Sequence, residues 1–143
     1  MKVAIGCDHG GFVLKELVKE HLIETGYEVD DKGCNSLDSV DYPAYGKAVA
    51  HAVADGEADR GIVICTTGIG ISIAANKVKG IRAALCSDIT SARLTREHND
   101  ANVLAMGGAI IGQMLALDIV DTFMETEFSE MEKHKRRIAA IED

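Results

Sequence analysis

Residues Gly61 to Lys77 read GIVICTTGIGISIAANK, and this stretch carries the strongest fold signal of the chain. It begins as a short β-branched apolar run, which is typical of a strand buried on both faces. A Thr-Thr-Gly-Ile-Gly turn follows, and an apolar run with helical character continues from Ile71 to Ala75. Open parallel sheets build anion sites with this order of elements, because the turn N–H groups and the positive end of the helix both point at the ligand. The stretch therefore predicts a parallel α/β sheet with an anion-binding turn.

A cysteine, Cys65, stands where this strand ends. A nearby helix N-terminus favours the thiolate over the thiol, so one turn combines a potential base or nucleophile with a potential oxyanion hole. The alternative is that a free cysteine is a buried, unreactive small hydrophobe. We expect that alternative for Cys7, Cys34 and Cys86. The position at the carboxyl end of a strand favours chemistry for Cys65.

At 143 residues the chain has room for one domain, residues 1–143, with a proper core. Its net charge of −8 and its aromatic content of 4% argue against nucleic acid and anionic membranes as partners. No apolar run approaches the ~20 residues of a membrane span, and the start of the chain has no signal-peptide pattern. Four scattered cysteines without C-x-x-C spacing indicate a reducing, cytoplasmic location rather than disulfides or structural zinc.

Apolar runs with strand character alternate with runs of helical spacing along the whole chain. This alternation predicts an α/β fold, a five-stranded parallel sheet with helices on both faces. The expected strands are Val3–Ile5, Tyr27–Val29, the run that ends at Cys65, Ile81–Leu85 and Asn102–Met106.

Several signals locate the helices. Gly26 is expected to stop the first helix, and Pro43 to lie near the first position of the second. We expect Met114 on the apolar side of a later, long helix. Ser129 and Glu132 have the spacing of a capping box, which would open a last helix at about residues 129–142.

A second glycine-rich turn, GCDHGG at residues 6–11, follows the first strand. In open parallel sheets the ligand lies beyond the carboxyl ends of the strands, where the strand order reverses. We therefore expect Asp8 and His9 to approach Cys65 and Thr67 there. The turns match neither the dinucleotide fingerprint nor the P-loop, and no arginine stands six residues after Cys65 as in a cysteine-based phosphatase.

Four motifs together closely resemble the ribose-5-phosphate isomerase type B and galactose-6-phosphate isomerase family. They are GCDHGG at residues 6–11, DYP at 41–43, CTTGIGISIAANK at 65–77 and REHNDANV at 96–103. The resemblance implies a three-layer, Rossmann-like fold and an aldose–ketose isomerase of the pentose phosphate pathway that needs no metal or cofactor. It also implies a homodimer, often paired into a tetramer, with active sites shared between subunits. The last helix is then expected to pack at the dimer interface.

The resemblance assigns Cys65 as the base that moves a proton between C1 and C2 of the opened sugar. Thr67 and His98 resemble the pair that opens the furanose ring, with His98 arriving from the partner subunit. A helix-capping role is the alternative for His98. The implied substrate contacts are the N–H groups of Gly68, Ile69, Gly70, Ile71 and Ser72 for the enediolate oxygen, Asp8, Tyr42 and Asn99 for hydroxyls, and His9 and Arg137 near the phosphate.

The sequence departs from the family at three places. The family often has Gly-Thr-Gly after the cysteine, and here residues 66–68 are TTG. The family usually has a phosphate-gripping arginine after the fifth strand, where this chain has Ala109. The tail pattern Gly-Gly-Arg-His is replaced by MEKH at residues 131–134. Arg137 keeps the family's place and shares a helix face with Lys133, so we expect both to hold the phosphate together with His9.

The expected function is the interconversion of ribose 5-phosphate and ribulose 5-phosphate through an enediolate. One alternative is an isomerase of another sugar phosphate, such as galactose or allose 6-phosphate or a tetrose phosphate. The other is a non-catalytic, sugar-phosphate-binding subunit that works beside a paralogue.

Overall fold

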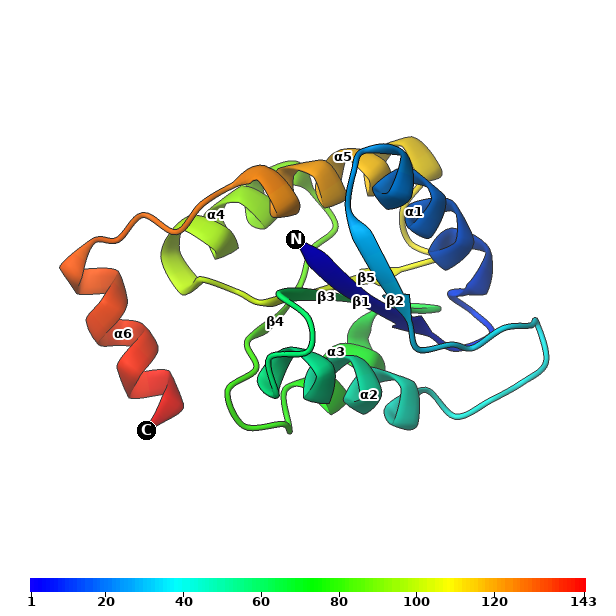
Figure 1. Ribbon diagram of the computed structural model, residues 1–143, viewed down its shortest axis with the longest axis horizontal. Helices are drawn as coiled ribbons and strands as arrows, with labels where there is room; N and C mark the ends of the chain where they lie inside the picture. Colours follow the sequence, from blue (N-terminus) through cyan, green and yellow to red (C-terminus); the bar gives the residue numbers. More distant parts are fainter.

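The computed structural model, which describes residues 1–143, contains one parallel sheet with the strand order β2-β1-β3-β5-β4 (Figure 1). The strands are β1 (Lys2–Cys7), β2 (Glu28–Asp31), β3 (Arg60–Cys65), β4 (Ala83–Leu85) and β5 (Val103–Gly107). The helices are α1 (Phe12–Glu24), α2 (Tyr42–Ala54), α3 (Ile69–Ala75), α4 (Ile89–Asn99), α5 (Gln113–Glu125) and α6 (Glu132–Glu142). The predicted α/β fold is confirmed, with all neighbouring strands parallel.

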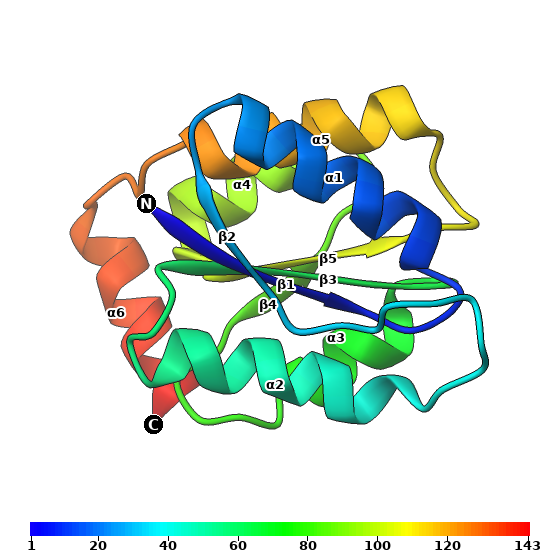
Figure 2. The ribbon, with the colours of Figure 1, turned by 45° about the vertical axis from the view of Figure 1, so that its right-hand side comes forward.

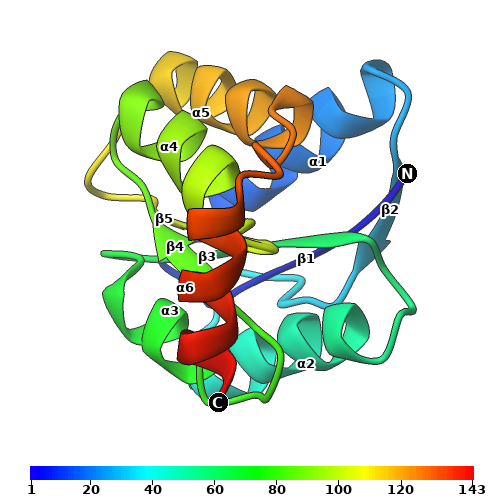
Figure 3. The same ribbon diagram turned by 90° about the vertical axis from the view of Figure 1, so that its left-hand side faces the viewer.

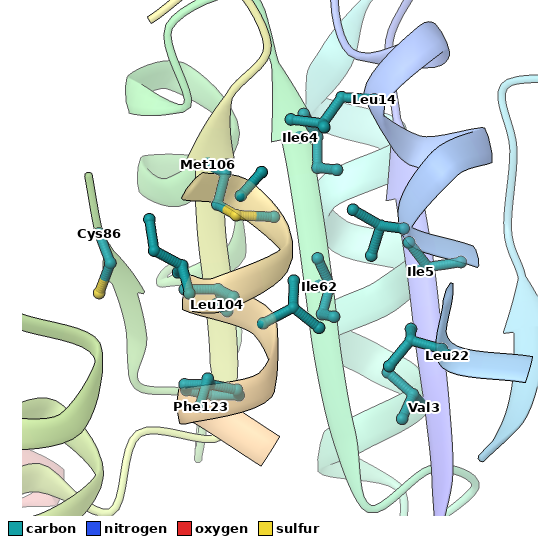
Figure 4. Packing of buried hydrophobic residues seen from close by; sticks show 14 of the residues in the cluster. Val3, Ile5, Leu14, Leu22, Ile62, Ile64, Cys86, Leu104, Met106 and Phe123 are labelled. Carbon is teal, nitrogen blue, oxygen red and sulfur yellow. The ribbon is translucent and has the colours of Figure 1, made fainter. Parts of the chain in front are cut away.

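Three layers are visible in Figure 2, with α1, α4 and α5 on one face of the sheet and α2 and α3 on the other. Large apolar side chains fill the first interface, because alternate residues of each strand point to the same face. Figure 4 shows Ile62 and Ile64 of β3 in the middle of this layer, with Phe123 of α5 packed over Leu104. Burying one such side chain contributes about 1.5–3 kcal/mol, so this layer supplies much of the stability.

The face covered by α2 and α3 has smaller residues. Ala4, Val63 and Ala105 point to this side. Glycine lets α2 approach closely here, since a Cβ added to Gly61 would lie 2.6 Å from Cγ1 of Val49. The short distance between α2 and the sheet keeps the neighbouring helix α3, and therefore the turn before it, close to the strand ends.

The last helix, α6, is packed differently from the others. It crosses the end of the sheet at which the strands begin, close to α4 (Figure 3). His134 is its only buried residue. An ion pair of 2.9 Å between Arg82 Nη1 and Glu142 Oε1 ties its far end to the sheet. Helix α6 therefore buries few side chains against its own chain.

Most predicted element boundaries are confirmed. Helix α1 ends at Glu24 before Gly26, whose φ of 98° suits glycine, and Pro43 lies in the first turn of α2. The predicted strand from Ile81 is shorter, because Arg82 N donates to the side chain of Asn102 instead of joining the strand ladder.

Two predictions at the helix ends are wrong. Met114 is 84% exposed, because it lies in the first turn of α5, whose buried residues begin at Ala116. Ser129 does not cap α6, which begins at Glu132 after an N-cap of Met131. The Ser129 hydroxyl is instead hydrogen-bonded to Nδ1 of His134 at 2.8 Å. No helix in the structure combines the length and the apolar character that a bilayer span requires.

Candidate active site

The strand order reverses between β1 and β3, and the turns that follow these two strands are in contact there. The N–H of Asp8 donates to the Ile64 carbonyl at 3.3 Å. A Cβ added to Gly10 would lie only 2.0 Å from Oγ1 of Thr66, so this approach requires glycine. The predicted meeting of the two glycine-rich turns is confirmed.

The end of β5 holds the same turn from the other side. The N–H of Gly108 donates to the Cys65 carbonyl at 2.8 Å, and the N–H of Ala109 donates to the Thr66 carbonyl at 3.0 Å. A Cβ on Gly107 would meet the Thr67 carbonyl oxygen at 2.5 Å. The main chain of residues 65–67 is therefore fixed by main-chain contacts on both sides.

Cys65 is the last residue of β3, and its side chain is 4% exposed. Its sulfur accepts a hydrogen bond of 3.1 Å from the N–H of Gly68. Gly68 has a φ of 78°, a left-handed conformation that favours glycine. Thr67 is exposed, and its hydroxyl oxygen accepts from the N–H of Ile69 at 3.2 Å. Both side chains are therefore oriented by the first residues of the following turn.

The N–H groups between Gly68 and Ser72 are not equivalent. Those of Gly68 and Ile69 are paired with Cys65 and Thr67, and that of Ser72 donates to the Gly68 carbonyl at 3.2 Å. The N–H groups of Gly70 and Ile71 have no acceptor within the chain. Of these five N–H groups, those of Gly70 and Ile71 are free to bind a ligand, and the predicted role of the whole set as anion donors stays a prediction.

Tyr42 lies beside Gly70, one of the two residues with a free N–H. A Cβ added to Gly70 would lie 2.5 Å from Cζ of the Tyr42 ring and 2.7 Å from its hydroxyl oxygen. Tyr42 is the first residue of α2, and its ring is 39% exposed. The phenol ring therefore packs against the main chain of Gly70, near the start of α3.

Asp8 is held by its own turn, and His9 by the loop before α2. Oδ1 of Asp8 accepts from the N–H groups of Gly10 at 2.9 Å and Gly11 at 3.2 Å. Nδ1 of His9 accepts from the N–H of Val40 at 3.2 Å, which in a neutral imidazole assigns the proton to Nε2. His9 therefore presents a hydrogen-bond donor on its free side.

His98 and Asn99 do not join this group within the chain. Helix α4 starts after the carboxyl end of β4 and runs back, so that its last residues lie where β5 begins. His98 is exposed, and its ring stacks on His134 of α6 at a centroid distance of 4.5 Å. The side chain of Asn99 accepts from the Thr95 hydroxyl at 3.1 Å. The two residues lie at the opposite end of the sheet from Cys65.

Lys133 and Arg137 are exposed on α6, close to the same histidine pair. Burial lowers the pKa of His134, and the neighbouring His98, Lys133 and Arg137 lower it further. These groups form a cluster of cationic and imidazole side chains suited to an anion such as a phosphate. The sequence shows His134 only as one member of a basic helix. Its burial against Ser129 follows from packing that no spacing reveals.

The other three cysteines are buried, as predicted. Burial raises the pKa of Cys7 to about 12 and that of Cys86 to about 11. Cys7 and Cys34 lie with their sulfur atoms 3.9 Å apart beneath the sheet edge. None of the three faces the turn that holds Cys65.

Residues 3–141 match the family described as Ribose/Galactose Isomerase, and the chain belongs to this family of sugar isomerases. It is 54% identical over 140 residues to ribose-5-phosphate isomerase B of Escherichia coli, covering 98% of this chain and 93% of the relative. A galactose-6-phosphate isomerase subunit of Clostridium acetobutylicum is 43% identical, with coverage of 100% and 83%.

Solved structures agree with this assignment. A ribose-5-phosphate isomerase B from Clostridium thermocellum superposes with a TM-score of 0.98 at 56% identity and covers 99% of this chain and 95% of its own. One from Thermotoga maritima has a TM-score of 0.96 at 52% identity, with coverage of 99% and 97%. The chain is thus an isomerase with the three-layer, Rossmann-like fold of these relatives.

Proposed function

We propose that the protein interconverts ribose 5-phosphate and ribulose 5-phosphate, and that Cys65 is the base. The observation that carries this proposal is the Cys65 sulfur, bonded to the Gly68 N–H and placed in the same turn as the free N–H groups of Gly70 and Ile71. Ribose-5-phosphate isomerases B at 54% and 56% identity support the choice of substrate.

In the proposed reaction, the Cys65 thiolate takes the proton from C2 of the open-chain aldose. The electron pair of that C–H bond forms the enediolate, whose negative oxygen is held by the N–H groups of Gly70 and Ile71. The thiol then returns the proton to C1, and a proton moves between the two oxygens, which gives the ketose. Base and anion site together serve proton abstraction next to a carbonyl. No metal or cofactor takes part in these steps. Because the base must be a free thiolate, a reducing compartment such as the cytoplasm belongs to the proposal.

The site is proposed to be completed by a second copy of the chain in a homodimer. His98, Asn99 and Arg137 lie at the opposite end of the sheet from Cys65, so one copy cannot bring them to its own thiol. Apolar side chains are exposed around the Cys65 turn, with Ile69 at 53% and Ile73 at 57% exposure, as expected for a surface that a partner covers. His98 of one subunit, with Thr67 of the other, would then open the sugar ring. Helix α6, poor in contacts within its own chain, would lie at this interface.

In such a dimer, the phosphate is proposed to lie between the Cys65 end of one subunit's sheet and the α6 end of the partner's sheet. His9 would approach it from the Cys65 side, with Lys133 and Arg137 of the partner's α6 opposite. Asp8, Tyr42 and Asn99 would bind the sugar hydroxyls between these points. Ala109, which replaces the family's arginine, is exposed next to the Cys65 turn and leaves one side of the phosphate without a cation.

A second candidate is an isomerase for a different sugar phosphate. The observation that favours it is Ala109, together with the galactose-6-phosphate isomerase subunit at 43% identity. A non-catalytic subunit is less well supported, since Cys65, Thr67 and His98 are all present.

The test is isomerisation of a panel of aldose phosphates with four to six carbons, each with and without a chelator. We expect the highest kcat/KM for ribose 5-phosphate, unchanged by chelation. A higher kcat/KM for a six- or four-carbon sugar would assign the second candidate. The absence of all turnover in the isolated protein, restored by a paralogous subunit, would assign the non-catalytic role.

A further inference from the structure

Arg82, the residue directly before β4, has a side chain that bonds two other segments of the chain. At the end of α4, its Nε donates to the Asn99 carbonyl and its Nη2 to the Asp100 carbonyl, both at 2.9 Å. At the far end of α6, its Nη1 donates to the Glu142 carboxylate at 2.9 Å. One planar guanidinium therefore holds the end of α4, which carries His98, and the helix α6, which carries the basic residues.

The end of α4 depends on donors from outside the helix, because the last carbonyl groups of a helix have no partner within it. Asp100, the C-cap residue, has a φ of 44°, a left-handed conformation that residues with a Cβ rarely adopt. Arg96, which is 4% exposed, donates from Nη1 to the Asp100 carboxylate and to the Ala101 carbonyl, both at 2.7 Å. Arg82 and Arg96 together fix the main chain that follows His98.

The side chain of Arg82 is separate from the bonds that hold its main chain. Its N–H donates to Oδ1 of Asn102 at 2.8 Å, and its carbonyl accepts from the N–H of Asn102 at 3.1 Å. These bonds stay in place when the side chain is shortened. The hydrogen bonds of the guanidinium go to α4 and α6 instead of to the sheet.

We infer that Arg82 is a positioning residue, whose side chain sets the end of α4 relative to α6 so that His98 and the basic residues of α6 face one ligand together. The stack of His98 on His134, with a centroid distance of 4.5 Å, joins the same two helices and reports their placement. Only the effect on turnover rests on the proposed function, in which His98 acts in the site of the partner subunit.

The first test measures the stack in the absence of sugar. The readout is the imidazole NMR signal of His98 at a fixed pH in the full chain, assigned by its loss in His98→Ala. We expect this signal in Arg82→Ala to move toward that of an unstacked histidine, because the ring current of His134 is lost.

The matched control is Arg93→Ala, which removes another arginine near the end of α4 and should leave the His98 signal unchanged. Arg93 is exposed and pairs with Glu97 of its own helix at 3.2 Å. If Arg82→Ala does not fold, Arg82→Lys replaces it, because lysine keeps the charge but lacks the planar fork that reaches all three acceptors. An unmoved His98 signal in a folded Arg82 variant would overturn the inference.

Turnover in mixed dimers separates positioning from a general loss of stability. In a dimer of Cys65→Ala with His98→Ala, the one intact site takes its His98 from the Cys65→Ala chain. We expect Arg82→Ala in that chain to lower the restored kcat about 10- to 100-fold, because small misplacements of reacting groups have effects of this size. The same substitution in the His98→Ala chain leaves the restored kcat unchanged, since the α4 of that chain serves the inactive site.

The two arrangements contain the same substitutions and differ only in which chain carries Arg82→Ala. Equal losses in both would show a merely structural role and overturn the inference. If the two parent variants restore no turnover after verified exchange, but the His98 signal moves in Arg82→Ala, the proposed shared site fails and the placement of α4 against α6 by Arg82 stands.

Discussion

The two ends of the sheet differ in how completely one chain builds them. At the carboxyl ends of β1, β3 and β5, the turn that holds Cys65 is bonded to main chain on both sides, and the thiol is buried. At the other end, His98 and the basic residues of α6 are exposed, and α6 buries only His134. The main chain around Cys65 is therefore preorganised within one chain, whereas the groups that we propose for ring opening and phosphate binding lie exposed at the far end of the sheet.

The strongest test of the carboxyl end is Cys65→Ala. Loss of a general base slows catalysis by about 10²- to 10⁴-fold. We expect this loss in kcat, with an unchanged circular dichroism spectrum and retained binding of ribose 5-phosphate. Turnover near the wild-type rate in the folded variant would remove Cys65 from the mechanism and make the preorganised end of the sheet a structural feature only.

Mixing two inactive variants tests whether the two ends meet between subunits. Random pairing of Cys65→Ala with His98→Ala makes about half of the dimers mixed, each with one intact site, so that about a quarter of the wild-type activity returns. The measurement is turnover after subunit exchange, which native mass spectrometry verifies. No recovery after verified exchange would place both residues in the site of the same subunit.

Arg137→Ala tests the basic cluster alone. Removal of a charged hydrogen bond costs about 1.5–3 kcal/mol, or about 10- to 150-fold in binding. We expect KM for the phosphorylated sugar to rise by that factor, with no change for an unphosphorylated analogue.

The neighbouring Arg136→Ala is the matched control, since Arg136 is also exposed but lies on a different face of α6. Equal losses for both sugars in Arg137→Ala would show that α6 is structural at this position. The reverse change, Ala109→Arg, tightens ribose 5-phosphate binding if that is the substrate, and abolishes turnover if the pocket is shaped for another sugar.

The smallest expected effect concerns the docking of α6 and its pH dependence. The pKa of His134 lies below its ordinary value of about 6.5 in the folded chain, so the folded state favours the neutral ring. Its contribution to stability is present above that ordinary value and is lost as the pH falls through the lowered pKa. The protection factors of the α6 amides, which correct for the intrinsic exchange rate at each pH, should therefore fall on acidification more in the wild type than in His134→Asn. Parallel pH profiles for the two proteins would contradict this role of His134.

Local sequence predicted the carboxyl end of the sheet well, because there each signal acts on its own neighbours. The β-branched run before Cys65 indicated a buried strand without reference to any distant segment. Gly10 and Gly68 lie where neighbouring atoms leave no room for a Cβ. The sequence did not show that the Gly68 N–H donates to the Cys65 sulfur, since this hydrogen bond depends on the left-handed backbone conformation of Gly68.

The other end was harder to predict, because its contacts join segments far apart along the chain. Ser129 and Glu132 have capping-box spacing, yet the Ser129 hydroxyl is drawn to His134, and the helix starts three residues later than expected. Strand β4 begins only at Ala83, because the N–H of Arg82 donates to the side chain of Asn102. Local spacing carries no information about such competing partners.

The turn at residues 65–67 is supported by main chain, from Gly10 on one side and from Gly107 and Gly108 on the other. Most substitutions at other positions exchange side chains and leave this main-chain support unchanged. Exposed residues next to this turn, such as Ala109, can therefore change during evolution without disturbing Cys65. Such an enzyme can evolve to accept a different sugar by exchanging these exposed residues. A side chain added at Gly10, Gly107 or Gly108 would instead displace the turn and abolish activity.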